Sequence, residues 1–368
     1  MNTRGLTQHI SSQAKWPLHD VSQTRAIEHE AQTALPTYTL MQRAGMATAQ
    51  LALAIAPHAQ RIWIACGPGN NGGDGLEAAV QLQAWGKHPI VTWFGQDDNV
   101  PMDAQLARDR AQAAGVAFSD RIPLTFDLAI DALLGMGAQR RPEGQIAAWL
   151  QVLQTTQTPV LCVDIPTGLN ADTGEWLGST TSHHNNAQRH TLSLLTLKPG
   201  LFTSHGRDAT GHVWFNDLSV DATSTPTAWL QQHVSTSFHR PHSSHKGSFG
   251  DVSVIGGTMG MSGAAVLAAV AALHGGAGRV FAGVMDASAH PAITATHPPL
   301  MLRAPADVPL ATSTVVCGCG GGDDIHAWLP NALSSSHKLV LDADALNAIA
   351  RDTSLQSLLK KRSARNTS

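Results

Sequence analysis

Residues 66–75 read CGPGNNGGDG, and this glycine-rich stretch decides the fold class. The apolar run RIWIA precedes it at 61–65, and LEAAVQLQAWG follows it at 76–86 with apolar residues at helical spacing. This order predicts a strand, a tight glycine turn and then a helix that Gly86 closes. Glycines let the backbone approach a bound molecule closely, and the amide groups at the start of a helix favour negative charge. The turn therefore fits a phosphate-bearing ligand.

The spacing of this stretch differs from two common phosphate-binding patterns. It is not a G-x-G-x-x-G followed by an acid about 20 residues on, and no Gly-Lys-Ser/Thr ends it. Asn70, Asn71 and Asp74 instead supply side-chain oxygens, which at a turn suit a hard cation. An Asn-Gly turn capped by Asp74 is the structural alternative.

The composition bounds the class of protein. The chain has 368 residues, 43% apolar and 14% charged, with a net charge of −3, which is typical of a globular protein with about two domains. No clustered basic face indicates a nucleic-acid partner. No run of 18 apolar residues indicates a membrane span, and the first residues lack the apolar core of a signal peptide. Four cysteines without zinc spacing fit a reducing cytoplasm, which we expect as the location.

Strand-like runs alternate with helix-like segments over residues 1–220. The strand-like runs are RIWIACG (61–67), PIVTWFG (89–95), DLAIDALLG (127–135), PVLCVDIP (159–166), TLSLLTLKPG (191–200) and HVWFNDLSV (212–220). Residues 23–54 carry a helical pattern that breaks near Pro36. Strands separated by helices of about 10–15 residues predict right-handed crossovers and a parallel sheet. We therefore expect a three-layer α/β domain here.

A second α/β pattern follows a polar segment. Residues 221–238 are rich in Ser, Thr and His, and we predict that they form a linker. Residues 239–368 then carry an apolar helix at 263–273, expected to be buried, between further strand-like runs. These runs are HKGSFGDVSVIGG (245–257), GRVFAGVM (278–285), STVVCGCGGG (313–322) and KLVLDADALN (338–347). This second domain has barely begun to close its sheet by residue 368.

Polar side chains also follow two other strands of the first domain. DALLGMGAQRRPEG places Asp131 on a strand before Arg140 and Arg141, and CVDIPTGLNADTG places Asp164 at a strand end before Thr167. In a parallel sheet the loops at the carboxyl ends of neighbouring strands converge on one crevice. Asp164 fits a general base there, or a turn cap. The two arginines fit a phosphate, or a solvated surface.

Five motifs occur in one order: LMQRAG (40–45), CGPGNNGGDG (66–75), DALLGMG (131–137), VDIPTGLNADTG (163–174) and KPG (198–200). Together, over roughly residues 20–220, they resemble the NAD(P)H-hydrate epimerase domain of the YjeF N-terminal type. The resemblance implies a Rossmann-like domain that interconverts the R and S epimers of hydrated NADH and NADPH, called NADHX and NADPHX. It also implies a bound potassium ion.

The resemblance assigns residues to this site. It implies that Asn71, Asp131 and Thr167 bind potassium, with Thr167 where the family often has Ser. The implied substrate-binding residues are Asn70, Asn71, Gly72, Gly73, Asp74, Gly135, Met136, Gly137, Ala138, Gln139, Arg140, Arg141 and Asp164. Met136 replaces the family's frequent Thr. We expect Asp164 to be catalytic and to carry a proton as the ring-nitrogen lone pair assists departure and return of the hydroxyl group.

The second α/β pattern carries its own resemblance. HKGSFGDVSVIGGTMGMSGAAVLAAVAALHGGAGRV, CGCGGG and LDADALN, over roughly 239–350, resemble the start of the ribokinase-like NAD(P)H-hydrate dehydratase domain, which depends on ADP or ATP with Mg²⁺. By this resemblance Gly256, Gly257 and Gly260 form a tight loop near the hydrate. Ala264 begins the apolar helix, and Gly322 lines the hydrate pocket.

The family's later motifs do not follow LDADALN in this sequence. A Thr-Pro-His-Pro loop, a Lys-Gly strand and a Gly-x-Gly-Asp nucleotide turn are the family features in question. We therefore expect ADP-dependent dehydration by this chain to be absent or weak, as for a fragment or a truncated gene. The expected domains are an epimerase domain at 1–220, a linker at 221–238 and an incomplete dehydratase domain at 239–368.

Two other classes compete with a repair enzyme. A non-catalytic cofactor-binding or scaffold protein would keep the fold, but the set Asn71, Asp131, Asp164 and Thr167 argues against it. A sugar kinase, suggested by the second domain alone, lacks its nucleotide loop. The family resemblance suggests a possible homo-oligomer. The preference between NADHX and NADPHX, and between ADP and ATP, stays open.

Overall fold

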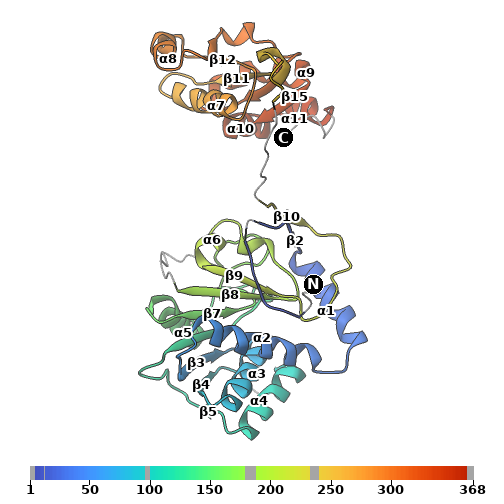
Figure 1. Cartoon of the computed structure of the whole chain (residues 1–368), viewed down its shortest axis with the longest axis vertical. Helices are drawn as coiled ribbons and strands as arrows, with labels where there is room; N and C mark the ends of the chain where they lie inside the picture. Colours follow the sequence, from blue (N-terminus) through green and yellow to red (C-terminus); the bar gives the residue numbers. More distant parts are fainter. Residues whose placement is uncertain (1–4, 12, 96–99, 179–187, 233–239, 363–368) are drawn as a thin grey trace. The chain divides into compact units, whose positions relative to one another are not determined.

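The computed structural model describes residues 5–11, 13–95, 100–178, 188–232 and 240–362. The chain divides into two compact units, Met1–Ser235 and Thr236–Ser368 (Figure 1). Both are α/β units built on largely parallel sheets, which confirms the predicted fold class. None of the helices in these ranges combines the length and the apolar character that crossing a bilayer requires.

The first unit is built on an eight-stranded sheet in the order β1-β9-β8-β7-β6-β3-β4-β5. The strands are β1 (Gln8–His9), β3 (Arg61–Cys66), β4 (His88–Trp93), β5 (Ala117–Phe118), β6 (Leu128–Ala132), β7 (Val160–Val163), β8 (Arg189–Leu194) and β9 (His212–Asn216). All neighbours pair in parallel except β1 with β9. The chain runs outward from β3 through β4 to β5 and then returns to β6 on the other side of β3. The switch in strand order therefore lies between β3 and β6.

Helices cover both faces of this sheet and make the predicted three layers (Figure 1). The helices are α1 (Val21–Ala34), α2 (Thr39–Ile55), α3 (Asn70–Ala84), α4 (Met102–Ala113), α5 (Gly144–Thr155) and α6 (Gly206–Ala209), with a short 3₁₀ turn η2 (Pro199–Leu201). Residues of α2, α3 and α4 share one buried apolar cluster with β3 and β6. Residues of α5 share another with Trp63 and Ala129, which point to the opposite face.

The N-terminal helix pattern breaks where the sequence predicted. The Asp20 carboxylate caps α1 by accepting a 2.8 Å hydrogen bond from the Gln23 amide. The chain then turns at Pro36, and α2 begins after Tyr38, whose φ of 72° lies in the left-handed region. The break separates two helices that both border the cavity described below, and α2 contributes most of their residues to the apolar core.

Helix α3 begins earlier than the sequence predicted. Asn70–Asp74 was expected to be a loop, but it forms the first turns of α3. The glycines permit close packing here rather than a non-helical turn. A Cβ at Gly72 would lie 1.9 Å from the Gly67 carbonyl oxygen, and one at Gly75 would lie 2.6 Å from the Ala132 Cβ. Glycine at these positions lets the helix start directly against β3 and β6.

Part of the predicted linker is ordered strand. Ala228–Leu230 forms β10, which pairs antiparallel with β2 (Trp16–Leu18) near the start of the chain. The first compact unit therefore runs past the predicted boundary at 220, because this return strand closes over the N-terminal segment. The last part of the predicted linker, 233–238, lies outside the described residues.

The second unit has a five-stranded parallel sheet in the order β13-β12-β11-β14-β15. The strands are β11 (Asp251–Gly256), β12 (Arg279–Val284), β13 (Met301–Leu302), β14 (Thr314–Cys317) and β15 (Lys338–Leu341). Its helices are α7 (Ser262–His274), α8 (His290–Thr296), α9 (Leu329–Ser335), α10 (Ala343–Arg351) and α11 (Thr353–Lys360), with 3₁₀ turns η3 (Lys246–Phe249), η4 (Ala287–Ala289), η5 (Pro305–Asp307) and η6 (Gly322–Ala327). Separate apolar clusters pack on its two faces.

The prediction of a buried apolar helix at 263–273 was wrong. In α7 only Ala265 and Ala269 are buried, and Leu267 is 73% exposed. The sequence is apolar on every side of this helix, so its pattern did not reveal which side packs on the sheet.

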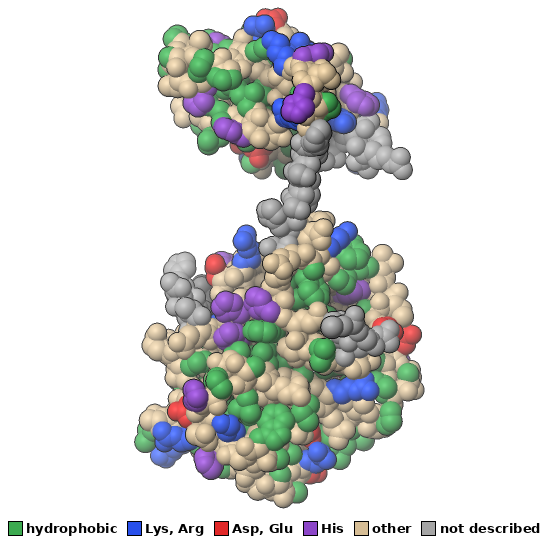
Figure 2. Space-filling model, in the orientation of Figure 1, with side chains coloured by type: hydrophobic (Ala, Val, Ile, Leu, Met, Phe, Trp, Pro, Cys, Tyr) green, Lys and Arg blue, Asp and Glu red, His purple; other side chains and the backbone are tan. Residues whose placement is uncertain are grey.

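Histidines gather at one edge of the first unit (Figure 2). The rings of His190 and His212 stack 5.1 Å apart, and His9 lies 5.8 Å from His212. The Trp214 indole nitrogen donates a 3.2 Å hydrogen bond to His190 Nδ1. Burial lowers the pKa of His190, and the neighbouring His212 and His9 add to this effect, so that the pKa falls to about 4. The His190 imidazole is therefore neutral at neutral pH.

Candidate active site

A cavity of about 420 Å³ opens in the first unit where the strand order switches. The loops after β3, β6, β7 and β8 border it, as expected for ligand sites in open parallel sheets. Eight of the predicted site residues line it: Asn70, Asn71, Asp74, Gly135, Met136, Gly137, Ala138 and Asp164. The three predicted loops therefore do converge on one site.

Five predicted substrate-binding residues do not line this cavity. Gly72 and Gly73 lie inside α3, where their missing side chains make room for neighbouring atoms. Gln139, Arg140 and Arg141 are exposed, and Arg141 packs against Gly178. Direct contact between these residues and a ligand in the cavity stays a prediction.

Other lining residues were missed because they come from helix α1 and from the loop after β8. Thr24, Glu28 and Gln32 are spaced by four residues, so they share one face of α1, and all three line the cavity. Lys198 lines it from the KPG motif. The sequence showed this lysine as part of the KPG motif but did not predict a role for it. The α1 residues gave no signal beyond helical spacing.

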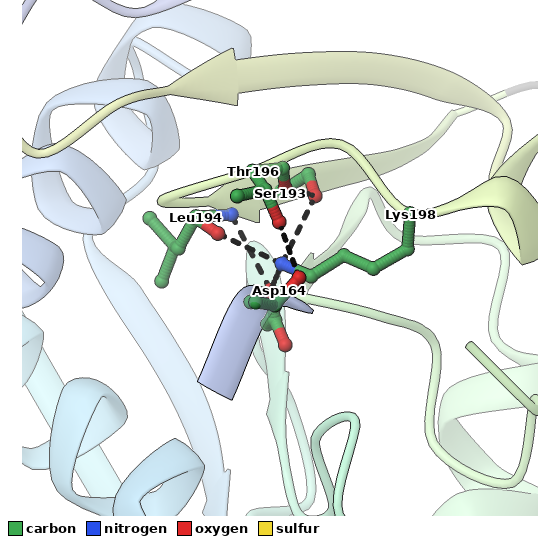
Figure 3. Close-up of polar contacts among 6 residues, drawn as sticks. Asp164, Ser193, Leu194, Thr196 and Lys198 are labelled. Carbon is green, nitrogen blue, oxygen red and sulfur yellow. Dashed lines mark hydrogen bonds and ion pairs between the residues drawn. The ribbon is translucent and has the colours of Figure 1, made fainter. Parts of the chain in front are cut away.

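Lys198 and Asp164 form a buried ion pair at the cavity wall (Figure 3). The Lys198 side chain is only 1% exposed, and its ammonium donates to Asp164 Oδ1 and, at 2.7 Å, to the Leu194 carbonyl oxygen. The Ser193 hydroxyl oxygen lies 3.4 Å away as a third acceptor. Asp164 itself has a φ of 65°, a left-handed conformation that is costly for a residue with a side chain. The fold thus holds one carboxylate in a strained position against a fully engaged lysine.

Three further carboxyl groups border the same cavity, those of Glu28, Asp74 and Asp103. Burial raises the pKa of Glu28, and the negative charge of Asp164 raises it further. Burial also raises the pKa of Asp74 well above its ordinary value, with smaller contributions from Asp164 and Glu28. Lys198 pairs with Asp164, so the cavity combines a paired carboxylate with two carboxyls that hold protons more readily.

Two of the predicted potassium ligands, Asp131 and Thr167, are hydrogen-bonded to each other, and the third, Asn71, is not part of that pair. The Thr167 hydroxyl donates a 2.6 Å hydrogen bond to Asp131 Oδ1, and the Thr167 amide donates to Oδ2 at 3.1 Å. Burial raises the pKa of Asp131, while these hydrogen bonds from Thr167 oppose the rise. Asn71 is 8% exposed, and both polar atoms of its side chain lack a hydrogen-bond partner among the described residues. A Cβ at Gly135 would lie 3.3 Å from Asn71 Oδ1, so this amide faces the loop after β6.

The predicted site residues of the second unit lie in different places. Gly322 borders a cavity of about 630 Å³, and its amide donates a 2.9 Å hydrogen bond to Asp344 Oδ2. Ala264 does not line that cavity and packs toward Gly320 instead. The Gly257 amide donates to the Cys319 carbonyl oxygen at 2.9 Å, which joins the two glycine-rich turns as expected for neighbouring strand ends.

Fold and site together define a class: a two-unit α/β protein whose first unit has a polar ligand cavity at the switch point of its sheet. Residues 37–200 match the family model described as the YjeF-related protein N-terminus. Residues 252–365 match the model described as NAD(P)H-hydrate dehydratase.

Three curated relatives place the chain more closely. It is 35% identical over 335 residues to the bifunctional NAD(P)H-hydrate repair enzyme of Escherichia coli (strain K12), covering 86% of this chain and 63% of that protein. It is 32% identical over 356 residues to the Coxiella burnetii enzyme of the same name, covering 92% and 72%. The Leishmania braziliensis enzyme is 31% identical over 390 residues, covering 94% and 66%. The chain belongs to the family of bifunctional NAD(P)H-hydrate repair enzymes, and it spans about two thirds of the length of these relatives.

Proposed function

We propose that the first unit epimerises hydrated nicotinamide cofactors, interconverting R and S NADHX or NADPHX. The observation that carries this proposal is the buried Asp164–Lys198 pair at the wall of the switch-point cavity. A cavity of about 420 Å³ is within the usual range for small-molecule sites. Family membership supports the choice of substrate.

Asp164 is the proposed proton carrier. The hydrate bears its hydroxyl group on the carbon beside the ring nitrogen, so the nitrogen lone pair can assist departure of that group. A water molecule must then add to the opposite face and lose a proton. Lys198 holds the Asp164 carboxyl group in place through Oδ1, and a carboxylate at this position can accept the proton. Within the described contacts Oδ2 of Asp164 has no hydrogen-bond donor, so this oxygen is available to do so.

The residues present fit the potassium ion that the family resemblance implies. Asn71 offers a buried amide oxygen with no partner in the described part of the chain, and Asp131 offers a buried carboxylate beside the Thr167 hydroxyl. Oxygen donors of this kind suit a hard cation. When bound, the ion would supply positive charge beside Asp131 and Asn71. These residues would then fix the start of α3 and the loop after β6 at the cavity.

For the second unit we propose the dehydration of S-NADHX or S-NADPHX, with ADP or ATP and Mg²⁺. The match of residues 252–365 to the dehydratase model supports this activity. The expectation that dehydration is weak in this chain stays a prediction. Association into homo-oligomers also stays a prediction. A cytoplasmic location is supported by the four cysteines, which are all free thiols.

A chromatographic assay tests the proposal. The chain is mixed with R-NADHX in potassium buffer, and the R and S peaks are followed with and without ADP or ATP and Mg²⁺. Approach to an R/S equilibrium without added nucleotide supports the epimerase. If NADH forms only with nucleotide, the second unit is active and the expected weakness is wrong. Unchanged peaks would favour the non-catalytic scaffold.

A further inference from the structure

Glu28 lies in the proposed epimerase cavity without a partner. Its carboxyl group makes no hydrogen bond or ion pair within the described residues, although it is half-buried on the cavity side of α1. Glu30, two residues on, points away from the cavity and is exposed. A half-buried carboxyl with no structural partner is costly unless it serves a ligand or holds a proton.

The fold fixes Glu28 beside the Asp164–Lys198 pair. The hydroxyl groups of Thr24 and Thr196 share a 2.7 Å hydrogen bond, which ties α1 to the loop that carries Lys198. The Ser193 hydroxyl donates to the Thr196 carbonyl oxygen at 2.8 Å, so the same network reaches the lysine. Glu28 follows Thr24 by one helical turn and therefore lies on the anchored face. The contact between α1 and the loop after β8 therefore fixes the position of Glu28 relative to the Asp164–Lys198 ion pair.

Burial and the surrounding charges together raise the pKa of Glu28. The charged groups that face it are Asp164 after β7, Lys198 after β8, Arg25 on α1, Asp103 on α4 and Asp74 on α3. Burial and the Asp164 carboxylate raise the pKa of Glu28, while Lys198 and Arg25 oppose this rise. Asp164, the carboxylate that raises the pKa of Glu28 most, is the one that Lys198 pairs with. The site therefore holds a carboxyl group whose pKa is raised, that of Glu28, beside a carboxyl group that is paired with a lysine.

We propose that Glu28 is the general acid of the epimerisation and that Asp164 is the general base. This inference rests on the proposed function. Glu28 protonates the hydroxyl on the carbon beside the ring nitrogen, and the C–O bond breaks as water leaves with its electron pair. The nitrogen lone pair forms a C=N double bond. Water adds to the opposite face of that carbon, Asp164 takes its proton, and the nitrogen regains its lone pair.

The proton balance of the reaction requires a general acid that can exchange its proton with solvent. Each turnover moves one proton from the acid to the base, so the acid must be recharged from solvent and the base discharged to it. No oxidant or reductant is needed. Both carboxyl groups are half-buried and line the cavity, Asp74 from α3 and Glu28 from α1, where Glu28 lies beside the exposed Arg25. Glu28 is therefore placed to exchange its proton with solvent, and the Asp74→Asn variant tests the alternative.

The test compares Glu28→Gln, Glu28→Asp and Asp74→Asn with the matched control Glu30→Gln on the same helix. Initial rates of R-to-S conversion of NADHX are measured between pH 5 and 9 in potassium buffer. General acid catalysis is worth about 100-fold or more, so Glu28→Gln should lower kcat by at least that factor with a small change in KM. Glu28→Asp should regain part of the rate. The fall in activity on the alkaline side should disappear in Glu28→Gln, which a purely structural role would not cause.

The outcomes separate this inference from the proposed function. If the wild type and Glu30→Gln epimerise and Glu28→Gln keeps the wild-type rate and pH profile, Glu28 is not the acid while the epimerase assignment stands. If only Asp74→Asn removes the alkaline fall, the acid is Asp74 and the inference is overturned. If the wild type leaves R-NADHX unchanged, the proposed function fails and the inference fails with it. Far-ultraviolet circular dichroism of each variant establishes that it is folded.

Discussion

Replacing Lys198 by Met tests the buried ion pair that organises the site. Methionine keeps much of the apolar stem but removes the ammonium, which donates to Asp164 and to the Leu194 carbonyl oxygen. Breaking one partner out of a buried pair costs about 3–5 kcal/mol, because the other charge stays buried. The stranded Leu194 carbonyl adds about 1 kcal/mol, and the 13% exposure of the Asp164 side chain relieves part of the cost. We therefore expect a loss of about 3–5 kcal/mol in the free energy of unfolding at pH 7.

Urea unfolding followed by tryptophan fluorescence measures this loss. Of the nine tryptophans, only Trp328 lies in the second unit, so the signal reports mainly on the first. Lys87→Met, in the same unit, is the control, with an expected change of about 0.5 kcal/mol or less. A deficit below about 1 kcal/mol at pH 7 would refute the reasoning.

Three further predictions follow from single contacts. Thr167→Val removes a hydrogen bond to Asp131 and a potential cation ligand, so the dependence of the epimerisation rate on potassium should weaken; an unchanged potassium titration would argue against a cation there. Gly72→Ala places a Cβ 1.9 Å from the Gly67 carbonyl oxygen and should destabilise the first unit by about 3 kcal/mol in urea unfolding, whereas Gly69→Ala, with open space around it, should cost far less. The pKa of His190 is lowered to about 4, below its unfolded value, so the wild type should lose stability as the pH falls from about 6.5 to 4. Solvent screening limits this loss to about 1–2 kcal/mol, and His190→Gln should remove most of it; an equal loss in the variant would show that other groups cause it.

The central strands could be predicted from the sequence because their residues are apolar without interruption. Both faces of β3 and β6 are buried, so Ile62, Ile64 and Ile130 belong to runs that read clearly as strands. The two-residue strands β1 and β5 are too short to show such an apolar run. Strand β10 lies in a polar segment, and only its pairing with β2, over 200 residues away, defines it. Long-range pairing of this kind leaves no local signal.

The start of α3 and the packing of α7 show a second limit of prediction from the sequence. Glycines were interpreted as a turn, but at Gly72 and Gly75 they serve close packing within a helix. Glycine permits both, and only the neighbouring carbonyl oxygen and side chains decide between them. In α7 an apolar residue on every side gave no direction for packing.

The candidate site was predictable where its residues come from strand-end loops. Asn71, Asp74, Gly135 and Asp164 follow β3, β6 and β7, and the parallel sheet brings these loops together. Glu28 was not predictable, because α1 precedes the first core strand and is placed at the cavity by long-range contacts such as the one between Thr24 and Thr196. A helical period alone does not tell which polar face borders a cavity.

The most direct test of the central claim is the interconversion of R and S NADHX by the wild type and by Asp164→Asn. Chromatographic peaks are followed in potassium buffer without nucleotide, and Asp208→Asn, at an exposed site in the same unit, is the control. We expect the wild type and Asp208→Asn to reach the R/S equilibrium, and Asp164→Asn to fall behind by about 100-fold or more while staying folded. Wild-type speed in a folded Asp164→Asn would contradict the assignment of proton transfer to this carboxylate.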